Sequence, residues 1–547
     1  MSDSQSDWWR GAVIYQIYPR SFQDSDGDGM GDLKGITDRL DHVASLGVDA
    51  IWLSPIFTSP MDDMGYDVSD YRDIEPTFGT LADFDRLIER AHELGLKVIV
   101  DQVYSHSSDR HPWFEESRSS RDNPKADWYV WADADEDGFV PNHWPSVFGG
   151  SAWQWDTRRR QYYLHNFLTS QPDLNFHNKE VQDEILDIME FWLDRGVDGF
   201  RLDTVNYYFH DPRLRNNPPL MTKAGRTAVR PYDMQEHLYS KTRPENVPFL
   251  RRMRATMDKY DARMMVGEVG ESFRAVDIMA DYTADGDKLH MAYSFEMLSP
   301  DFSAAHFRHC VKAFFDAARS RNGWPCWSFS NHDVIRHVSR WAPYSKDLDA
   351  LAKQAAALLL SLEGTICLYQ GEELGQTETE LSFEELVDPP GITFWPEYKG
   401  RDGCRTPMVW QAQAEHGGFS DGKPWLPVKP EQAARAVDRQ QDDPNSVLAF
   451  YREMLAYRKG SAALTTGETE FANLPEPLLA FSRGEEKDGV LAIFNLSAEP
   501  QSVTLGAHVT PESVSRNVVA ADGTLDLGPN GFALIKGLSV DAVHVNA

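Results

Sequence analysis

The chain has 547 residues, with 54 Lys and Arg against 85 Asp and Glu, so its formal net charge is −31. This acidic balance disfavours nucleic acids, anionic membranes and phosphate-rich ligands as partners, because all of these bind best to basic surfaces. Since 41% of the residues are hydrophobic, the chain can build a sizeable core, which excludes a disordered polyampholyte.

The N-terminal segment, residues 1–7, has neither a basic nor an apolar stretch, so no signal peptide is expected and a cytoplasmic location is predicted. The longest apolar run, around 355–362, falls far short of the ~20 residues of a membrane-spanning helix. Four scattered cysteines without a CxxC pair predict buried free thiols rather than a disulfide framework or a zinc site. They are Cys310, Cys326, Cys367 and Cys404.

Short runs of β-branched and apolar residues recur along the chain. Eight of them are typical of strands buried on both faces: 13–18, 50–54, 97–103, 199–203, 264–268, 291–295, 326–330 and 365–369. Stretches between them, such as 81–94, 181–193 and 351–362, have a helical period. Strands that alternate with helices indicate a parallel sheet of the α/β class, and eight strands close a (β/α)₈ TIM barrel. A doubly wound open sheet is the weaker alternative.

Three parts of the chain depart from this alternation. Residues 105–171 are weakly periodic and rich in Trp, Asp, Asn and Pro, which predicts a B domain inserted after the third strand. The barrel then comprises residues 1–104 and 172–465. Within it, residues 371–429 after the eighth strand are irregular, and form either a lid over the barrel or a long surface excursion. Residues 466–547 contain short alternating strands, which predict a C-terminal antiparallel β-sandwich domain.

Polar side chains gather where several predicted strands end. They are Asp101 and His106 at the third strand, Arg201 and Asp203 at the fourth, Glu268 at the fifth, and His332 and Asp333 at the seventh. The carboxyl ends of barrel strands meet on one face, where active sites are built. One such residue alone is as often a helix cap or a hydrogen-bonded core group, but several together favour a site. No Gly-x-Ser-x-Gly elbow, dinucleotide fingerprint or HExxH pair competes with it.

Several carboxylates without a redox cofactor or zinc suit the hydrolysis of glycosides. One carboxylate attacks the anomeric carbon, while a second, held protonated, donates to the leaving oxygen. Arg201 lies two residues before Asp203, on the same side of a strand, and an adjacent cation keeps a carboxylate ionised. Asp203 is therefore the predicted nucleophile, and Glu268, with no cation adjacent in sequence, is the predicted acid/base.

Four segments resemble the signature regions of the α-amylase family, glycoside hydrolase family 13: 101–106, 199–203, 266–269 and 329–333. Residues 171–175 resemble the fifth region in the form found in the oligo-1,6-glucosidase and α-glucosidase branch. Residues 8–22 and 59–67 fit the same branch, and the likeness runs in order from about residue 8 to at least 410. One departure is Ser105, where the family often has Asn before the histidine.

The resemblance implies a retaining, exo-acting α-glucosidase that favours α-1,4 bonds, uses small α-glucosides, and needs no organic cofactor and no obligate protein partner. Asp203 matches the nucleophile, Glu268 the acid/base, and Asp333 the residue that binds sugar hydroxyls and distorts the ring. A transglucosylase or sucrose isomerase with the same covalent intermediate is the nearest alternative. A non-catalytic, transporter-associated relative is a remote one, because this chain carries the whole catalytic set.

The resemblance also implies a set of substrate-binding residues. His106, Arg201 and His332 would grip the non-reducing-end glucose, and Tyr66 would stack on its ring. Asp63 and Arg401 would close the pocket behind O4 of that glucose, with a surface salt bridge as the alternative. Thr204 follows the nucleophile directly, and in this branch Val at this place goes with α-1,6 links, whereas Thr or Ala goes with α-1,4.

An acidic loop after the first strand carries a different pattern. Its carboxylates stand at loop positions 1, 3, 5 and 9, with a backbone carbonyl at 7, and the residues are Asp24, Asp26, Asp28, Asp32 and Met30. Hard oxygen ligands on alternate residues around Gly indicate a Ca²⁺ loop. Position 12 is Gly35 instead of a bidentate Glu, so the loop is not an EF-hand. A structural Ca²⁺ ion is expected here, as the resembling branch implies, and a solvated acidic turn is the alternative.

Overall fold

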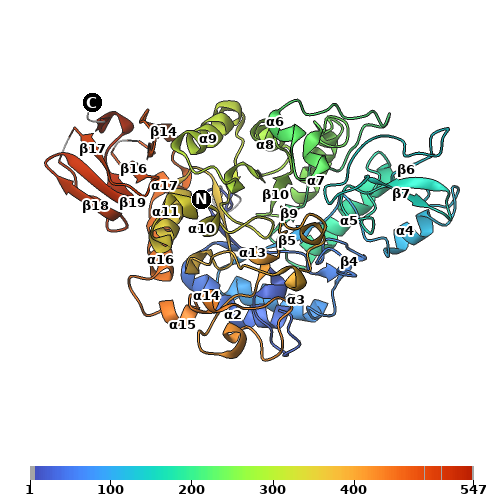
Figure 1. Cartoon of the computed structure of the whole chain (residues 1–547), viewed down its shortest axis with the longest axis horizontal. Coiled ribbons are helices and arrows are strands. Elements are labelled where there is room, and N and C mark those ends of the chain that lie inside the picture. The colour runs from blue at the N-terminus through green and yellow to red at the C-terminus, as the bar shows by residue number, and fades with distance from the viewer. Residues whose placement is uncertain (1–6, 486, 507, 545–547) are drawn as a thin grey trace.

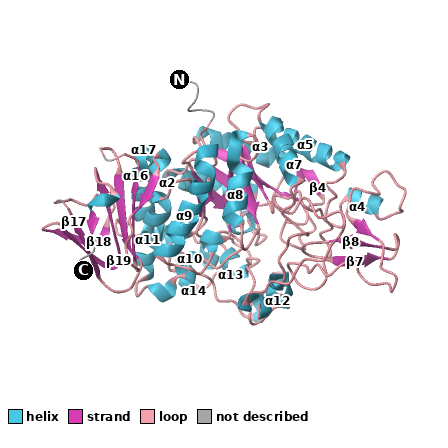
Figure 2. Ribbon diagram, turned by 90° about the horizontal axis from the view of Figure 1, so that it is seen from above, coloured by secondary structure: helices cyan, strands magenta, loops and turns pink. Residues whose placement is uncertain are grey.

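A computed structural model of the chain describes residues 7–485, 487–506 and 508–544. Residues 1–6 of the segment where no signal peptide is expected lie outside the described residues. A central barrel has a small inserted domain at one end of the long axis and a β domain at the other (Figure 1). The view from above shows the same order of the three parts (Figure 2). None of the described helices is long and apolar enough to cross a lipid bilayer.

The predicted barrel is confirmed, because all eight runs form one parallel sheet, ordered β11-β10-β9-β5-β2-β1-β13-β12. The strands are β1 (Val13–Ile17), β2 (Ala50–Leu53), β5 (Lys97–Gln102), β9 (Gly199–Leu202), β10 (Met264–Val269), β11 (Met291–Ser294), β12 (Cys326–Trp327) and β13 (Thr365–Tyr369). A parallel bridge between Ala292 and Pro325 joins the two ends of this order, so the sheet closes. The open doubly wound sheet is therefore wrong.

Amphipathic helices surround the strands. The longer ones are α2 (Leu33–Leu46), α3 (Leu81–Glu93), α5 (Lys179–Asp194), α7 (Asn246–Met257), α8 (Ala275–Thr283), α9 (Ala304–Ala318), α11 (Leu348–Ser361) and α16 (Val447–Lys459). In α3, a capping box between Thr80 and Asp83 starts the helix. Its buried residues Phe84, Leu87, Ile88 and Ala91 recur every three or four positions, so one face packs on the barrel.

The inserted segment forms a small domain of its own. It contains α4 (Pro112–Ser117) and a three-stranded sheet of β6 (Trp131–Ala132), β8 (Gln161–Leu164) and β7 (Trp153–Asp156). Bridges from His106 to Asp173 and from Tyr129 to Leu174 hold its two ends together above the third barrel strand. A second small hairpin, β3 (Phe57–Thr58) with β4 (Asp70–Ile74), follows the second barrel strand.

The C-terminal domain is antiparallel, as predicted. Its strands are β14 (Thr469–Phe471), β15 (Leu478–Arg483), β16 (Val490–Asn495), β17 (Gln501–Leu505), β18 (Arg516–Ala521), β19 (Thr524–Lys536) and β20 (Val543–His544). The long β19 pairs with β17 and β18 through its first half and with β16 through its second half. Phe532 of β19 meets Phe450 of α16 on the barrel side, while Ile493 and Val503 share a second core on the other. The domain is thus one antiparallel sheet with a hydrophobic core on each face.

The connections after β9 and β13 reach over the carboxyl end of the barrel. Residues 371–429 include α12 (Pro389–Thr393) and α13 (Asp402–Arg405), and the connection after β9 includes α6 (Lys223–Arg226). The remaining α-helices are α10 (His337–Arg340), α14 (Pro430–Ala433), α15 (Val437–Gln440) and α17 (Ala462–Thr466). All four cysteines are free and buried, as expected.

Candidate active site

A cavity of about 310 Å³ opens where the barrel strands end. Eight of the predicted residues line it: Asp63, Tyr66, His106, Asp203, Thr204, Glu268, Asp333 and Arg401. Arg201 and His332 are fully buried and hydrogen-bond to lining residues from behind. The structure therefore brings together every residue that the sequence analysis assigned to catalysis or substrate binding.

Arg201 is the buried centre of this polar network. Its Nη1 donates to both oxygens of Asp101, at 2.8 and 2.9 Å, and to Oδ1 of Asp203 at 2.8 Å. Its Nη2 donates to Oε2 of Glu268 and, at 2.9 Å, to the hydroxyl of Tyr293. The contact with Asp203 follows from the strand period, whereas the contact with Glu268 crosses from β9 to β10 and left no local signal in the sequence.

Glu268 has the electrostatics of a proton donor. Its side chain is almost completely buried, and burial raises the pKa of its carboxyl well above the ordinary value. Arg201 opposes this shift, but the charges of Asp203 and Asp333 add to it. The expected protonation of Glu268 thus arises from burial and like charges, in spite of a direct arginine contact.

Asp333 lies in the opposite environment, between two guanidinium groups. Its Oδ1 accepts from Arg405 at 3.0 Å and from Arg401 at 3.4 Å. Burial works against its charge, but His332 and the two arginines outweigh burial, so the pKa of Asp333 lies below the ordinary value. Asp333 is a carboxylate that can accept hydrogen bonds from sugar hydroxyls. Arg405 was missed, because nothing in the strand pattern points to a residue of the excursion after β13.

Asp63 and Arg401 form a buried ion pair of 2.7 Å in the cavity wall. Asp388 binds the same guanidinium at 2.6 Å, and Gln171 donates to Oδ2 of Asp63 at 3.0 Å. The alternative of a surface salt bridge is wrong, since both side chains line the cavity and are almost fully buried. The pair joins the loop after β2 to the excursion after β13.

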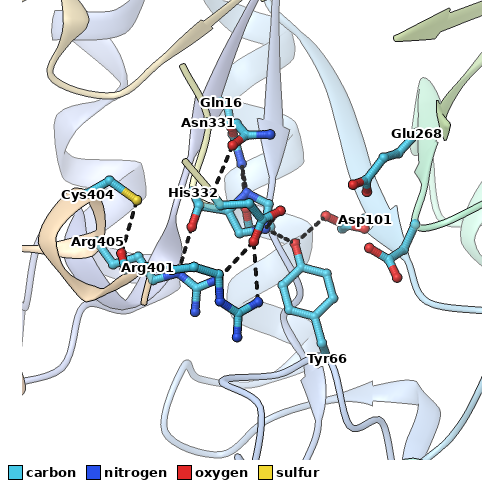
Figure 3. Close-up of polar contacts among 12 residues, drawn as sticks. Gln16, Tyr66, Asp101, Glu268, Asn331, His332, Arg401, Cys404 and Arg405 are labelled. Carbon is cyan, nitrogen blue, oxygen red and sulfur yellow. Dashed lines mark hydrogen bonds and ion pairs between the residues drawn. The ribbon is translucent and has the colours of Figure 1, made fainter. Parts of the chain in front are cut away.

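Tyr66 and His332 stack in parallel, with ring centroids 5.3 Å apart. The amide of Gln16 lies 2.7 Å from Nδ1 of His332, which leaves Nε2 to donate to the Tyr66 hydroxyl at 2.5 Å. Tyr66 in turn donates to Asp101 at 3.1 Å. Figure 3 shows Arg401 and Arg405 on one side of His332 and Asp101 and Glu268 on the other.

The connection between β9 and β10 forms a further part of the cavity wall, which the sequence analysis did not predict. Residues 203–263 separate β9 from β10, and this long gap was the available signal. Tyr207 and Tyr232 share a hydrogen bond of 2.6 Å between their hydroxyls, and Lys241 donates to the carbonyl of Gly270 at 2.6 Å. Together with Phe167 from the inserted domain, these residues line the cavity.

The acidic loop after β1 brings three of its carboxylates together. Asp24, Asp26 and Asp28 each place one oxygen within 4.8 Å of the others. Asp24 is buried and oriented by the amides of Gly27 and Gly29, each at 2.8 Å. Three hard oxygen donors at this spacing fit a divalent cation such as Ca²⁺.

Asp32 lies outside this group of three carboxylates, and the backbone carbonyl of Met30 stays a predicted ligand. Asp32 caps α2 by accepting from the amide of Gly35 at 2.7 Å, and it also binds Ser25. Met30 donates its amide to Asp28 at 2.7 Å. A helix N-cap competes for the carboxylate of Asp32, because the first helical amides have no other partner.

Comparison with known proteins gives similarities over nearly the whole chain. Residues 16–467 match the family described as alpha amylase, catalytic domain. The chain is 60% identical to a probable alpha-glucosidase of Rhizobium meliloti (strain 1021) over 498 residues, 90% of each chain. It is 38% identical over 534 residues to an oligo-1,6-glucosidase of Parageobacillus thermoglucosidasius, 92% of each chain.

Two solved structures show the same three-part architecture. The alpha-glucosyl transfer enzyme XgtA superposes with a TM-score of 0.93 at 54% identity, covering 97% of this chain and 99% of that one. The trehalulose synthase MutB from Pseudomonas mesoacidophila MX-45 has a TM-score of 0.86 at 34% identity, with coverage of 97% and 99%.

Proposed function

The chain belongs to the α-amylase family and is a glycoside hydrolase, and from this premise we propose that it is a retaining exo-α-glucosidase. It would release glucose from the non-reducing ends of short α-glucosides. The observation that carries the proposal is the guanidinium of Arg201, which contacts Asp203 and Glu268 through different nitrogens. The two carboxyl groups are ~5–5.5 Å apart in retaining enzymes and further apart in inverting enzymes. A single guanidinium bridges the shorter distance more readily.

The reaction then proceeds in two displacements. Asp203 attacks the anomeric carbon and forms a glycosyl ester, while Glu268 gives its proton to the leaving oxygen. Glu268, now charged, accepts a proton from water, and the water oxygen bonds to the anomeric carbon. The bond from that carbon to Asp203 breaks, so glucose leaves with the original configuration and Asp203 is a carboxylate again. The ion pair of Asp63 and Arg401 supports exo action, because a buried pair in the cavity wall would stop a substrate from extending past one terminal glucose.

A time course of products from maltose, isomaltose and sucrose tests this proposal. We expect α-glucose as the first product, followed by mutarotation, since two inversions at one carbon restore the configuration. Initial release of β-glucose would show inversion and contradict the roles of Asp203 and Glu268.

Transglucosylation is the second candidate, and the similarity to an alpha-glucosyl transfer enzyme favours it. Hydrolysis and transfer share the glycosyl ester and differ in whether water or a second hydroxyl accepts the sugar. The same time course separates them. Di- and trisaccharides that accumulate at high maltose, or isomers formed from sucrose, would indicate transfer or isomerisation.

We predict that maltose is cleaved with higher kcat/KM than isomaltose, and that Thr204→Val narrows this gap. The hydroxyl of Thr204 lies in the cavity wall and donates to Asp203 at 3.1 Å, which a valine methyl cannot do. One such bond contributes about 0.5–1.5 kcal/mol, so the expected change in selectivity is about ten-fold. Kinetics of both proteins on both disaccharides measure it, and an isomaltose preference of the wild type would refute it.

We also propose that Asp24, Asp26 and Asp28 hold a structural Ca²⁺ ion. The ion would offset the mutual repulsion of these carboxylates and stabilise the loop after β1, whose three aspartates do not line the cavity of the reacting carboxylates. We predict that chelation lowers the melting temperature more than it lowers kcat at 25 °C, since an ion bound only by the folded state stabilises that state. Mg²⁺ and Ca²⁺ are compared by readdition, and a melting temperature that chelation leaves unchanged would contradict the site.

A further inference from the structure

Ser105 connects a sugar-binding histidine to the neighbour of the nucleophile. Its side chain is buried just after β5. Its Oγ lies 2.9 Å from Nδ1 of His106 and 3.0 Å from Oγ1 of Thr204. Oγ1 of Thr204 lies 3.1 Å from Oδ2 of Asp203. A continuous chain of hydrogen bonds therefore runs from His106 to the nucleophile.

The hydrogens in this chain can be assigned. Burial lowers the pKa of His106, so the ring is neutral. Its Nε2 lies 2.8 Å from the carbonyl oxygen of Tyr66, which can only accept. The amide nitrogen of Gln171 is also near Nε2, at 3.2 Å, but its two hydrogens go to Asp63 and to the same carbonyl, at 3.0 and 3.1 Å. Nε2 therefore carries the hydrogen, and Nδ1 is an acceptor. Ser105 then donates its one hydrogen to Nδ1 and can only accept from Thr204. The hydroxyl hydrogen of Thr204 consequently has two acceptors, Ser105 and Asp203.

The charge of Asp203 decides between these acceptors. A hydrogen bond to a carboxylate is about twice as strong as one between neutral groups, so Thr204 donates to Asp203 while that residue is ionised. Oδ1 of Asp203 is held by the fully buried Arg201, whereas Thr204 lines the cavity, so Oδ2 is the oxygen on the sugar side. When Oδ2 bonds to the anomeric carbon, it loses its charge and becomes a weak acceptor.

We propose that Ser105 is a positioning residue that accepts the Thr204 hydrogen bond while the glycosyl ester exists and returns it to Asp203 when the ester is hydrolysed. This inference rests on the proposed function, because it requires the ester. In the first step the bond from Oδ2 to the anomeric carbon forms, the bond from that carbon to the leaving oxygen breaks, and Glu268 supplies the proton to the leaving oxygen. The hydrogen of Thr204 only changes its acceptor.

The backbone holds Thr204 in place for this exchange. Its φ of +38° is uncommon for a β-branched residue. The flanking amides fix it: Asp203 donates to the carbonyl of Gln102 and Val205 to that of Glu268, each at 3.0 Å. Because these bonds tie Thr204 to the strands on both sides, rotation of its hydroxyl is sufficient to change the acceptor.

A double-mutant cycle tests the inference with an aryl α-glucoside as substrate. Ser105→Ala should lower kcat/KM about ten-fold, because the buried Thr204 hydroxyl loses its acceptor as Asp203 gives up its charge in the transition state that forms the ester. In the Thr204→Val background the same change should cost no more than about two-fold, since no hydroxyl remains to be accepted. Equal losses in both backgrounds would mean that Ser105 acts through His106 alone, and would overturn the proposal.

The conservative variant is a second readout, because the proposal requires an acceptor oxygen at this position. A Ser105→Thr variant that folds but is as slow as Ser105→Ala would also overturn the proposal. Ser105→Thr keeps the hydroxyl and should restore the rate, and thermal melting of each variant checks folding.

Ser107→Ala is the matched control from the same loop. Ser107 is equally buried, but its hydroxyl lies 2.6 Å from that of Tyr129, away from the nucleophile, so kcat/KM should stay at the wild-type value. Failure of this inference is separate from failure of the proposed function. If Asp203→Asn is inactive but the effects of Ser105→Ala and Thr204→Val on kcat/KM are additive, the proposed function stands and only the role of Ser105 is refuted.

Discussion

Asp203→Asn should remove nearly all turnover, with a loss in kcat of about 10⁴-fold or more, because an amide cannot form the glycosyl ester. The fold should persist. The amide oxygen can still accept from Nη1 of Arg201, and both oxygens of Asp101 still accept from the same nitrogen. Steady-state kinetics on maltose and thermal melting measure the two expectations.

Asp41→Asn is the control for this substitution. Asp41 is an exposed carboxylate paired with Arg90, and such pairs contribute less than about 1 kcal/mol, so activity and melting temperature should both stay unchanged. If Asp203→Asn kept more than about a tenth of the wild-type kcat, a change under ~1.4 kcal/mol in the barrier, Asp203 would not be the nucleophile.

Glu268→Gln should lower kcat on maltose by about 10²–10⁴-fold, the usual contribution of a general acid. Hydrolysis of a dinitrophenyl α-glucoside should lose far less in the first step, because its leaving group needs no proton. Deglycosylation then becomes slow, because a glutamine cannot act as the general base that accepts the proton of water. Added azide should therefore accelerate turnover and yield α-glucosyl azide, which product analysis detects. Equal losses on both substrates would assign Glu268 a binding role instead.

The pH profile provides a second test of Glu268. The residue must be protonated to donate, so activity falls as pH rises through its pKa. Because burial and the neighbouring carboxylates raise this pKa, the basic limb should lie well above the ordinary range of a glutamate. Glu268→Gln should abolish this basic limb in the residual activity on maltose, whose leaving group needs a proton. A basic limb that persists in the variant would belong to another group.

The barrel and the convergence of its carboxylates could be predicted from the sequence, because both follow from local rules. Apolar runs that alternate with amphipathic helices specify buried parallel strands, and eight of them close. The carboxyl ends of parallel barrel strands lie on one face of the barrel, so Asp203, Glu268 and Asp333 had to share that face. The spacing of Arg201 and Asp203 placed both on one side of β9 for the same reason.

Contacts between remote, irregular segments could not be predicted in this way. Loops have no hydrophobic period, so neither the approach of Arg405 to Asp333 nor the wall made by the connection after β9 follows from a pattern. The acidic series around Asp32 predicts a metal ligand, and the structure adds that the same carboxylate caps α2, which the series alone does not indicate.

The sequence by itself determined which residues meet at the barrel mouth, because strand order and period decide that. Only the tertiary structure decided what each of them touches there. It turned Arg201 toward Glu268 as well as Asp203, and it placed the Ser105 hydroxyl beside that of Thr204. Such contacts depend on side-chain rotamers and burial in a closed barrel. The surrounding charges and burial, and not the neighbours in the chain, raise the pKa of Glu268 and lower that of Asp333, so that one is protonated and the other ionised.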